Sequence, residues 1–227
     1  MKNTLLIEIF LLIFITNPFI INCQTDSSVS LSKSEFSGSI IYKYDRVLKT
    51  YQCEDLLPPV IDSMRFDYRK GFIQIIEYIK GKISGYTLYN PIVNKIFQNN
   101  KTLDSLLCEE GNINESMSSI QYFVDLECKQ KILNYQCKCI SGNESPKSYI
   151  TLFYSKDLFI NPKSIKSNRV LFSYYFYTTN APFLKYIYSK NGCEEIYTAI
   201  RIEKKEFTIA DFELFKLPVS LAAPNKG

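Results

Sequence analysis

Residues 119–140, SIQYFVDLECKQKILNYQCKCI, carry the pattern that decides the fold. Apolar and polar side chains alternate through 120–128 and again through 132–140. A period of two places the alternate side chains on opposite faces of a β strand. With a turn near residues 129–131, this stretch is predicted to form an antiparallel hairpin with its cysteines on the apolar face.

The hairpin limits how its three cysteines can pair. Cys137 and Cys139 would lie about 6.5–7 Å apart on one strand with parallel side chains, so they are not expected to bridge each other. Cys128, beside the predicted turn, is expected to lie far from both. The partners of these three cysteines are therefore predicted among Cys53, Cys108 and Cys193, with buried free thiols as the alternative.

The rest of the chain also favours strands. Short alternating segments recur from residue 36 to the C-terminus, and turns are expected at Lys70-Gly71 and Asn90-Pro91. A short helix is expected after Asn161-Pro162. Residues 103–116 are expected to form a helical turn or an irregular excursion from the sheet, and residues 53–64 a short helix or a loop. Residues 207–215 are expected to form a closing strand. The predicted fold is mainly β, a single curved antiparallel sheet or incomplete barrel with one or two short helices, in one domain.

The N-terminus indicates export. Residues 1–23 combine a lysine, an apolar run and a short exit segment, which is typical of a signal peptide. The exit segment also resembles a bacterial lipobox, so Cys23 is the candidate lipid-attachment residue, with ordinary cleavage after Cys23 as the alternative. Residues 24–35 are predicted to be a polar linker. Six cysteines would then remain, an even number typical of disulfides in exported chains.

Composition excludes several functions. The chain has no histidine, which removes Ser-His-Asp and Cys-His catalysis and histidine-ligated metals. The cysteines lack CxxC spacing, so neither a metal site nor a cofactor is expected. The net charge of +4 is small and dispersed, so nucleic acid is not an expected partner. Nothing in the sequence calls for an oligomer, and a monomer is expected.

A series of short motifs resembles a known group of exported proteins. Phe36-x-Gly38-x-Ile40-x-Tyr42 opens the series, and KILNYQCK at 131–138 and FTIADFELFKLP at 207–218 follow. Their order over 36–218 resembles exported Bacteroidetes proteins of LolA-like architecture, the DUF4412 and GLPGLI-type families, and leaves 219–227 as a C-terminal tail. The resemblance implies an incomplete barrel around an apolar cleft, which holds acyl chains in LolA-type carriers, and a location in the periplasm or at the outer membrane.

The leading hypothesis is therefore a non-catalytic envelope protein that binds acyl chains or a lipidated partner, with membrane contact through an N-terminal lipid where Cys23 is modified. The candidate cleft residues are Ile40, Tyr42, Ile120, Tyr122, Val124, Tyr135 and Phe153. One alternative is a surface lipoprotein that binds another protein. The other is a thiol-redox protein that uses Cys137 and Cys139, since Lys138 between them could lower a thiol pKa.

Overall fold

The computed structural model describes residues 34–48, 61–99, 106–111, 124–145, 148–167, 173–212 and 219–221. The chain divides into two compact units, residues 1–32 and 33–227, and all the described residues belong to the second. Within the described residues, no helix combines the length and hydropathy needed to cross a bilayer. The signal peptide, Cys23, most of the predicted linker and Cys53 lie outside the described residues.

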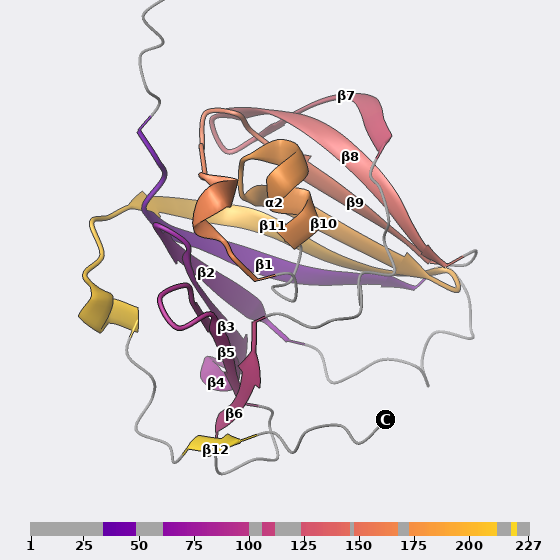
Figure 1. Ribbon diagram of the computed structural model, residues 1–227. Helices are drawn as coiled ribbons and strands as arrows, with labels where there is room; N and C mark the ends of the chain where they lie inside the picture. The colour runs from indigo at the N-terminus through magenta and orange to yellow at the C-terminus, as the bar shows by residue number, and fades with distance from the viewer. Residues whose placement is uncertain are drawn as a thin grey trace, which may run out of the picture. The chain divides into compact units, whose positions relative to one another are not determined.

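In the described part of the chain, twelve strands form one sheet (Figure 1). The order is β12-β6-β5-β4-β3-β2-β1-β11-β10-β9-β8-β7, antiparallel throughout except for the parallel pair β12 and β6. The predicted mainly β fold with a single curved antiparallel sheet is confirmed. The strands are β1 Gly38–Leu48, β2 Ser63–Arg69, β3 Phe72–Ile79, β4 Lys82–Asn90, β5 Lys95–Asn99, β6 Leu106–Glu110, β7 Val124–Ile132, β8 Tyr135–Ser145, β9 Ser148–Tyr154, β10 Phe183–Lys190, β11 Cys193–Lys204 and β12 Val219–Leu221.

Tight turns join most neighbouring strands. Lys70 and Gly71 connect β2 to β3 with φ of 43° and 88°, and Asn94, with φ of 51°, precedes β5. Glycine and asparagine adopt this left-handed region more readily than other residues. The predicted turns at Lys70-Gly71 and after Asn90 are therefore present.

The β7–β8 hairpin corrects the sequence prediction. Its turn lies at Leu133 and Asn134 rather than at 129–131, because Ile132 pairs with Tyr135. A bulge between Leu126 and Gln130 places three β7 residues opposite a single β8 residue, Lys138.

The shifted register brings together two cysteines that the sequence analysis kept apart. Cys128 and Cys139 form a disulfide with a Cα–Cα distance of 5.9 Å. The expectation that Cys128 is remote from Cys139 was wrong because it assumed an unbulged hairpin with an earlier turn.

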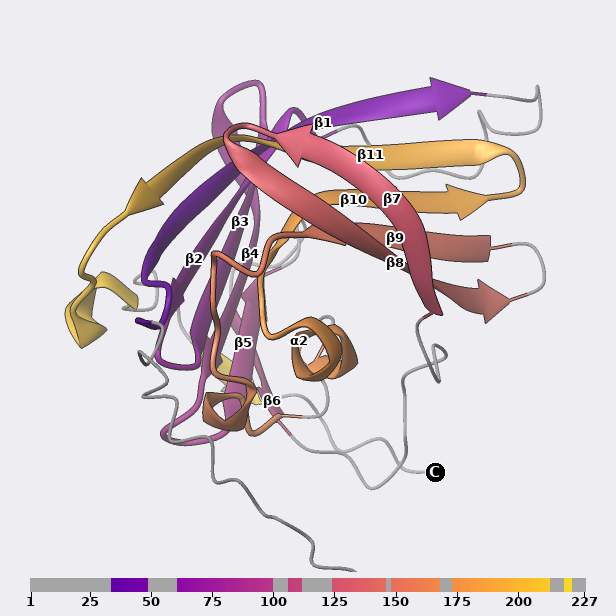
Figure 2. The ribbon, with the colours of Figure 1, turned by 90° about the horizontal axis from the view of Figure 1, so that it is seen from above.

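A short helical segment fills the concave side of the sheet. The 3₁₀ helix η2 (Pro162–Ser164) and the α-helix α2 (Ser173–Thr179) connect β9 to β10 and lie inside the curve (Figure 2). The helix η2 confirms the short helix expected after Asn161-Pro162, and α2 was not predicted. Tyr175 and Phe176 of α2 are almost fully buried and join the main core of inward-facing side chains.

A second, smaller core lies on the opposite face of the sheet. Phe72 and Ile76 of β3 and Leu88 of β4 pack there against Phe207 and Phe212. Phe212 ends the 3₁₀ helix η3 (Ile209–Phe212), so in the described part of the stretch, 207–212, the predicted strand is wrong. The Asp211 carboxylate accepts hydrogen bonds from the Thr208 amide (2.5 Å) and hydroxyl (2.8 Å), which favours a tight turn over a strand.

Two further segments differ from the sequence interpretation. Leu106–Glu110, in the stretch expected to be a helical turn or an excursion, forms β6 beside β5. Val219–Leu221, in the range assigned to the C-terminal tail, forms β12 beside β6. Both strands belong to the sheet margin, where five or fewer residues are too short to give a clear alternation.

Candidate functional site

The predicted cleft residues that the structure describes lie in different surroundings. Ile40 and Tyr42 are completely buried in the main core, and the Tyr42 hydroxyl donates to the Phe183 carbonyl oxygen at 2.6 Å. Tyr135 is half-buried and packs against the same core. Val124 is 56 % exposed on the edge strand β7. Ile120 and Tyr122 lie outside the described residues.

Phe153 is half-buried and contacts the main core only from its margin. Its neighbours Leu152 and Tyr154 are buried in that core, and the alternation of β9 directs Phe153 away from them. The Lys185 ammonium lies 5.4 Å from the centre of its ring. The cleft assignment of these residues therefore stays a prediction.

Four tyrosines form a patch on the concave face beyond α2. We call Tyr44, Tyr186, Tyr188 and Tyr197 the tyrosine patch. Tyr44 pairs with Tyr197 across β1 and β11, and Tyr197 pairs with Tyr186 across β11 and β10, so their side chains share one face. The ring centres lie 5.1 Å and 5.5 Å apart in these two pairs.

The patch is continuous with the main core. Tyr186 contacts the ring of Phe183 at 6.0 Å, and Phe183 contacts Tyr175 of α2 at 6.2 Å. Tyr186, Tyr188 and Tyr197 are only partly buried. The ends of β8–β11 that carry the β10–β11 turn extend past α2 in Figure 2. Ring contacts thus run from the buried core to tyrosines that are only partly buried.

A charged pair borders the tyrosine patch. Arg46 and Glu195 lie opposite each other on β1 and β11, and their side chains approach to 3.4 Å. The Tyr44 hydroxyl donates to Glu195 at 3.1 Å and accepts from Arg46 Nε at 3.0 Å. Burial raises the pKa of Tyr44, and the hydrogen bond from Arg46 opposes part of that rise. The pair therefore satisfies the Tyr44 hydroxyl as both donor and acceptor.

Burial also keeps the neighbouring phenol protonated. The pKa of Tyr197 is raised, first by desolvation and then by the negative charges of Glu195 and Glu77. A tyrosine in this setting is a neutral hydroxyl with an apolar ring at any physiological pH. Such a side chain suits an apolar ligand with a polar end.

Buried tyrosines fix the segment that precedes α2. The Tyr89 hydroxyl accepts from the amides of Lys166 and Ser167 at 2.9 and 3.0 Å and donates to Asn94 Oδ1 at 3.0 Å. The Tyr68 hydroxyl donates to Glu35 at 2.5 Å. The Tyr68 hydroxyl also lies 3.0 Å from the Ser164 hydroxyl of η2. These bonds tie the 3₁₀ helix η2 and its flanks to strands β2 and β4.

The cysteines do not form the predicted redox pair. Cys139 is bonded to Cys128, whereas Cys137 is a buried free thiol in the main core. Burial raises the pKa of Cys137, which is the opposite of what a reactive thiol needs. Cys108 is also free and buried, and Cys193 is disulfide-bonded.

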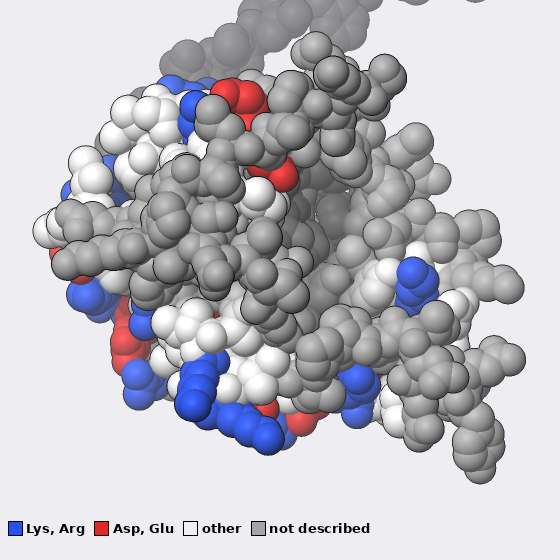
Figure 3. Space-filling model, turned by 90° about the horizontal axis from the view of Figure 1, so that it is seen from below, with Lys and Arg blue, Asp and Glu red and all other residues white. Residues whose placement is uncertain are grey.

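Charged side chains on the described surface form neither a metal site nor a patch of one sign. Among the described residues, no three His, Cys, Asp or Glu side chains gather closely enough to hold a metal ion. On the face drawn in Figure 3, the described Lys and Arg side chains are interspersed with Asp and Glu.

Sequence reasoning missed the tyrosine patch although it recognised the strands that carry it. The alternation in KYIYSK and EEIYTAI shows which side chains share a face, but it does not show which face is concave. It also does not show where α2 lies along the strands. The cross-strand neighbours Tyr186 and Tyr197 could have been found only from the register.

No protein-family model and no curated protein sequence matches this chain. Solved structures do resemble it. A structure of PNGF-II is similar with a TM-score of 0.50 and 14 % identity over 83 % of this chain and 31 % of that chain. This chain therefore spans about a third of the length of PNGF-II, and the likeness is one of fold.

Two further structures are similar at lower scores. An uncharacterized conserved protein from Thermus thermophilus has a TM-score of 0.48 and 8 % identity, over 82 % of this chain and 91 % of that one. A LolA superfamily protein from Nitrosomonas europaea has a TM-score of 0.36 and 7 % identity, over 80 % and 91 %. At these scores the two similarities carry no functional conclusion, and membership of a DUF4412 or GLPGLI-type family stays a prediction.

Proposed function

We propose that this protein is an exported, non-catalytic binding protein that holds an acyl chain, free or attached to a lipidated partner, on the concave face of its sheet. The observation that supports the proposal is the tyrosine patch, in which Tyr186, Tyr188 and Tyr197 pack against the main core but are only partly buried. Ligand sites of this kind are concave, mostly apolar and provided with a few polar groups.

The chemistry of the patch suits an amphipathic chain. The partly buried rings of Tyr186, Tyr188 and Tyr197 offer apolar area, and a tyrosine hydroxyl supplies a polar group beside it. Arg46 and Glu195 border the patch, where the polar group of an acyl chain would lie. An acyl chain would therefore lie with its tail toward Phe183 and its polar group toward the β10–β11 turn.

Export rests on separate observations. A disulfide such as Cys128–Cys139 is typical of an oxidising compartment. Residues 1–23 have the composition of a signal peptide, and Cys23 is the proposed site of an N-terminal lipid. The intact mass of protein purified with its own signal distinguishes an acylated Cys23 from a chain that begins at Gln24.

The binding proposal is tested with a fluorescent fatty acid, cis-parinaric acid. Purified protein is titrated with the probe, and Tyr188→Ser is compared with the control Tyr149→Ser. Tyr149 lies on the adjacent strand β9 on the opposite face and is 42 % exposed. Tyr188→Ser is expected to weaken probe binding about tenfold through lost apolar contact, and Tyr149→Ser to leave it unchanged.

Two results would overturn this proposal. The first is saturable binding of the probe that both variants retain in full, because the site then lies elsewhere. The second is the absence of any saturable binding together with no copurifying lipid in native mass spectra. The alternative of a surface protein that binds another protein is favoured by one observation, the exposed edge strand β7.

A further inference from the structure

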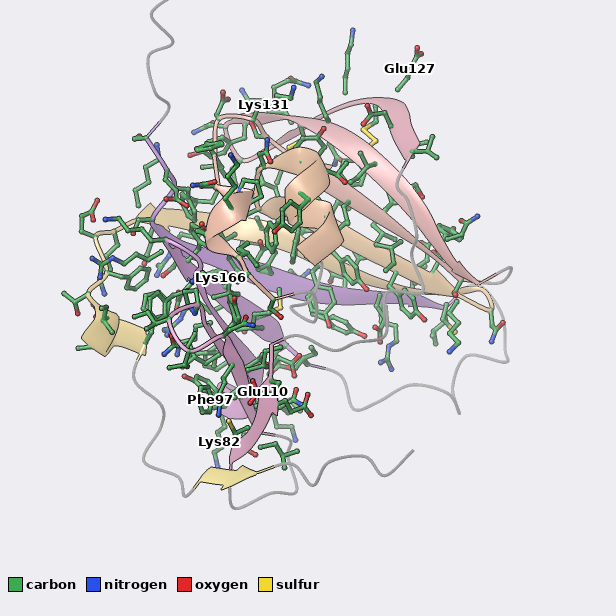
Figure 4. All side chains as sticks on the ribbon, viewed as in Figure 1. Lys82, Phe97, Glu110, Glu127, Lys131 and Lys166 are labelled. Atoms are coloured by element: carbon green, nitrogen blue, oxygen red, sulfur yellow. A yellow bond between two sulfur atoms is a disulfide. The ribbon has the colours of Figure 1, made fainter. Side chains whose placement is uncertain are left out.

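The strand β7 forms one end of the sheet. It pairs with β8 on one side, and within the described residues no strand pairs with its other side. Six of its nine residues are exposed, including Val124 and Leu126. The labelled Glu127 and Lys131 project away from the sheet (Figure 4). An edge with free amides and carbonyls is a template for another strand.

The charges on this edge follow a self-complementary order. Asp125, Glu127, Lys129 and Lys131 occupy alternate positions and are all exposed. The two acidic residues precede Cys128 and the two basic residues follow it, at matching distances. Within the described part of the chain, none of the four is in an ion pair.

We propose that β7 pairs antiparallel with β7 of a second copy of this chain, about a two-fold axis beside Cys128. In this register Asp125 faces the partner subunit's Lys131, and Glu127 faces the partner subunit's Lys129. Because the axis repeats both contacts, the pairing creates four cross-strand ion pairs. The inference concerns a surface separate from the tyrosine patch and does not depend on the proposed function.

The charge order selects this register against its competitors. A parallel pairing of two β7 strands in register would place each carboxylate beside a carboxylate and each ammonium beside an ammonium. An antiparallel pairing shifted by two residues would leave half of the opposite-charge pairs unmatched. Edge strands that avoid association commonly carry lysines or other charges, so it is the order of the charges on β7, and not their presence, that favours this pairing.

The bulge and the disulfide shape the same edge. The ladder between β7 and β8 is broken between Leu126 and Gln130, and a bulge there usually discourages pairing because it bends the strand. The disulfide joins Cys128, within the bulge, to Cys139 of β8. The centre of the proposed interface is thus held covalently to the sheet, which reduces the ordering that dimerisation would require.

The test uses two variants of opposite charge. In Asp125→Lys/Glu127→Lys all four positions of the edge are basic, and in Lys129→Glu/Lys131→Glu all four are acidic. Sedimentation velocity is run on the disulfide-intact full domain, wild-type and both variants, alone and mixed. The wild-type is expected to dimerise, each variant alone to weaken dimerisation about tenfold or more, and the mixture to form a heterodimer.

Two further readouts make the outcome decisive. Dimerisation of the wild-type should weaken as sodium chloride rises from about 50 to about 500 mM, because exposed ion pairs are screened. Circular dichroism and the retained disulfide verify that the variants are folded. The proposal is overturned if the wild-type stays monomeric at several hundred micromolar, if either variant dimerises as tightly as the wild-type, or if the mixed variants do not associate.

Discussion

Cys128 and Cys139 are disulfide-bonded across the β7–β8 hairpin, although the facing residue of Cys139 in the strand ladder is Leu126. The bulge between Leu126 and Gln130 explains this relationship, because it gathers extra β7 residues beside one position of β8. The bond therefore closes a local irregularity at the edge of the sheet.

Loss of this bond should destabilise the protein. The disulfide joins residues 11 apart in the sequence, and the chain-entropy relation for a loop of that size gives about 3 kcal/mol. Cys128→Ser/Cys139→Ser is therefore expected to lower the free energy of unfolding by about 3 kcal/mol, measured by urea denaturation at pH 7.

The control is Cys108→Ala, which removes a buried free thiol in the margin strand β6. Cys108→Ala should lower the free energy of unfolding by less than the double variant does, because it removes only a small buried group. Peptide mapping of unreduced wild-type protein provides the direct check. Alkylation of Cys128 and Cys139 without reductant would show that the pairing is wrong.

This hairpin also shows where the sequence is sufficient and where it is not. The alternation indicated two strands, at 120–128 and 132–140, since side-chain period depends on each strand alone. In the described part of the chain the two strands are Val124–Ile132 and Tyr135–Ser145, and Val124 and Leu126, expected on the apolar face, are exposed. The turn was misplaced because Lys129, Gln130 and Lys131 form a polar run, whereas the observed turn has a leucine at positive φ, Leu133 at 52°. Leucine is uncommon there, so only the pairing with β8 reveals the turn.

The candidate site was less predictable than the fold. The alternation placed Ile40 and Tyr42 on one face of a strand, but a strand pattern cannot distinguish a residue buried in the core from one that lines a cleft. The position of α2 depends on long-range contacts such as that between Phe66 and Phe176, whose ring centres lie 6.3 Å apart. The helix itself was missed because SYYFYTT is rich in aromatic and β-branched residues, which favour strands.

Two similar turns should respond differently to alanine. Gly71 and Gly81 each follow a lysine in a two-residue turn and have φ of 88° and 70°. A Cβ atom at Gly81 would meet no atom within 4 Å, whereas one at Gly71 would overlap the Ser164 carbonyl group of η2. Gly81→Ala should cost about 1 kcal/mol from the backbone alone.

Gly71→Ala should lower the free energy of unfolding by about 1–3 kcal/mol more than Gly81→Ala does, because η2 must move to accept the new Cβ atom. Urea denaturation measures both, and hydrogen exchange of the Ser164 and Ile165 amides should quicken only in Gly71→Ala, since both amides donate within the η2 turn. Equal costs in the two variants would contradict the close contact with Ser164.

Removal of the Tyr89 hydroxyl should loosen the segment before α2. Tyr89→Phe leaves the amides of Lys166 and Ser167 without their acceptor, and an unsatisfied buried donor costs about 1–3 kcal/mol. The variant should therefore be less stable by about 2 kcal/mol or more, with faster exchange of these two amides.

Tyr177→Phe provides the matched control. Its hydroxyl donates to the Ile165 carbonyl at 3.1 Å, but Tyr177 is 54 % exposed. Water can replace that donor, so the loss should stay within about 0.5–1 kcal/mol. If both variants lose the same stability, Tyr89 does not anchor the segment.

The last prediction concerns a buried carboxylate of β2. Asp67 is 1 % exposed, accepts from the Ser39 hydroxyl at 2.6 Å and lies 3.0 Å from Arg65. Burial raises the pKa of Asp67, and the hydrogen bond from Ser39 and the charge of Arg65 only partly oppose the rise. In the unfolded chain the pKa of an aspartate is about 3.9.

A carboxyl whose pKa is raised by folding contributes its stability in full below the unfolded pKa and loses it as the pH rises through the folded pKa. Asp67→Asn cannot ionise and escapes this loss. Its stability relative to the wild-type should therefore increase from about pH 4 to about pH 7.5, as measured by urea denaturation at several pH values. Asp45→Asn, at an exposed ion pair with Lys43, should show no such trend. If the free energy of unfolding of the wild-type instead rises relative to that of Asp67→Asn as the pH rises, attraction to Arg65 outweighs burial at Asp67.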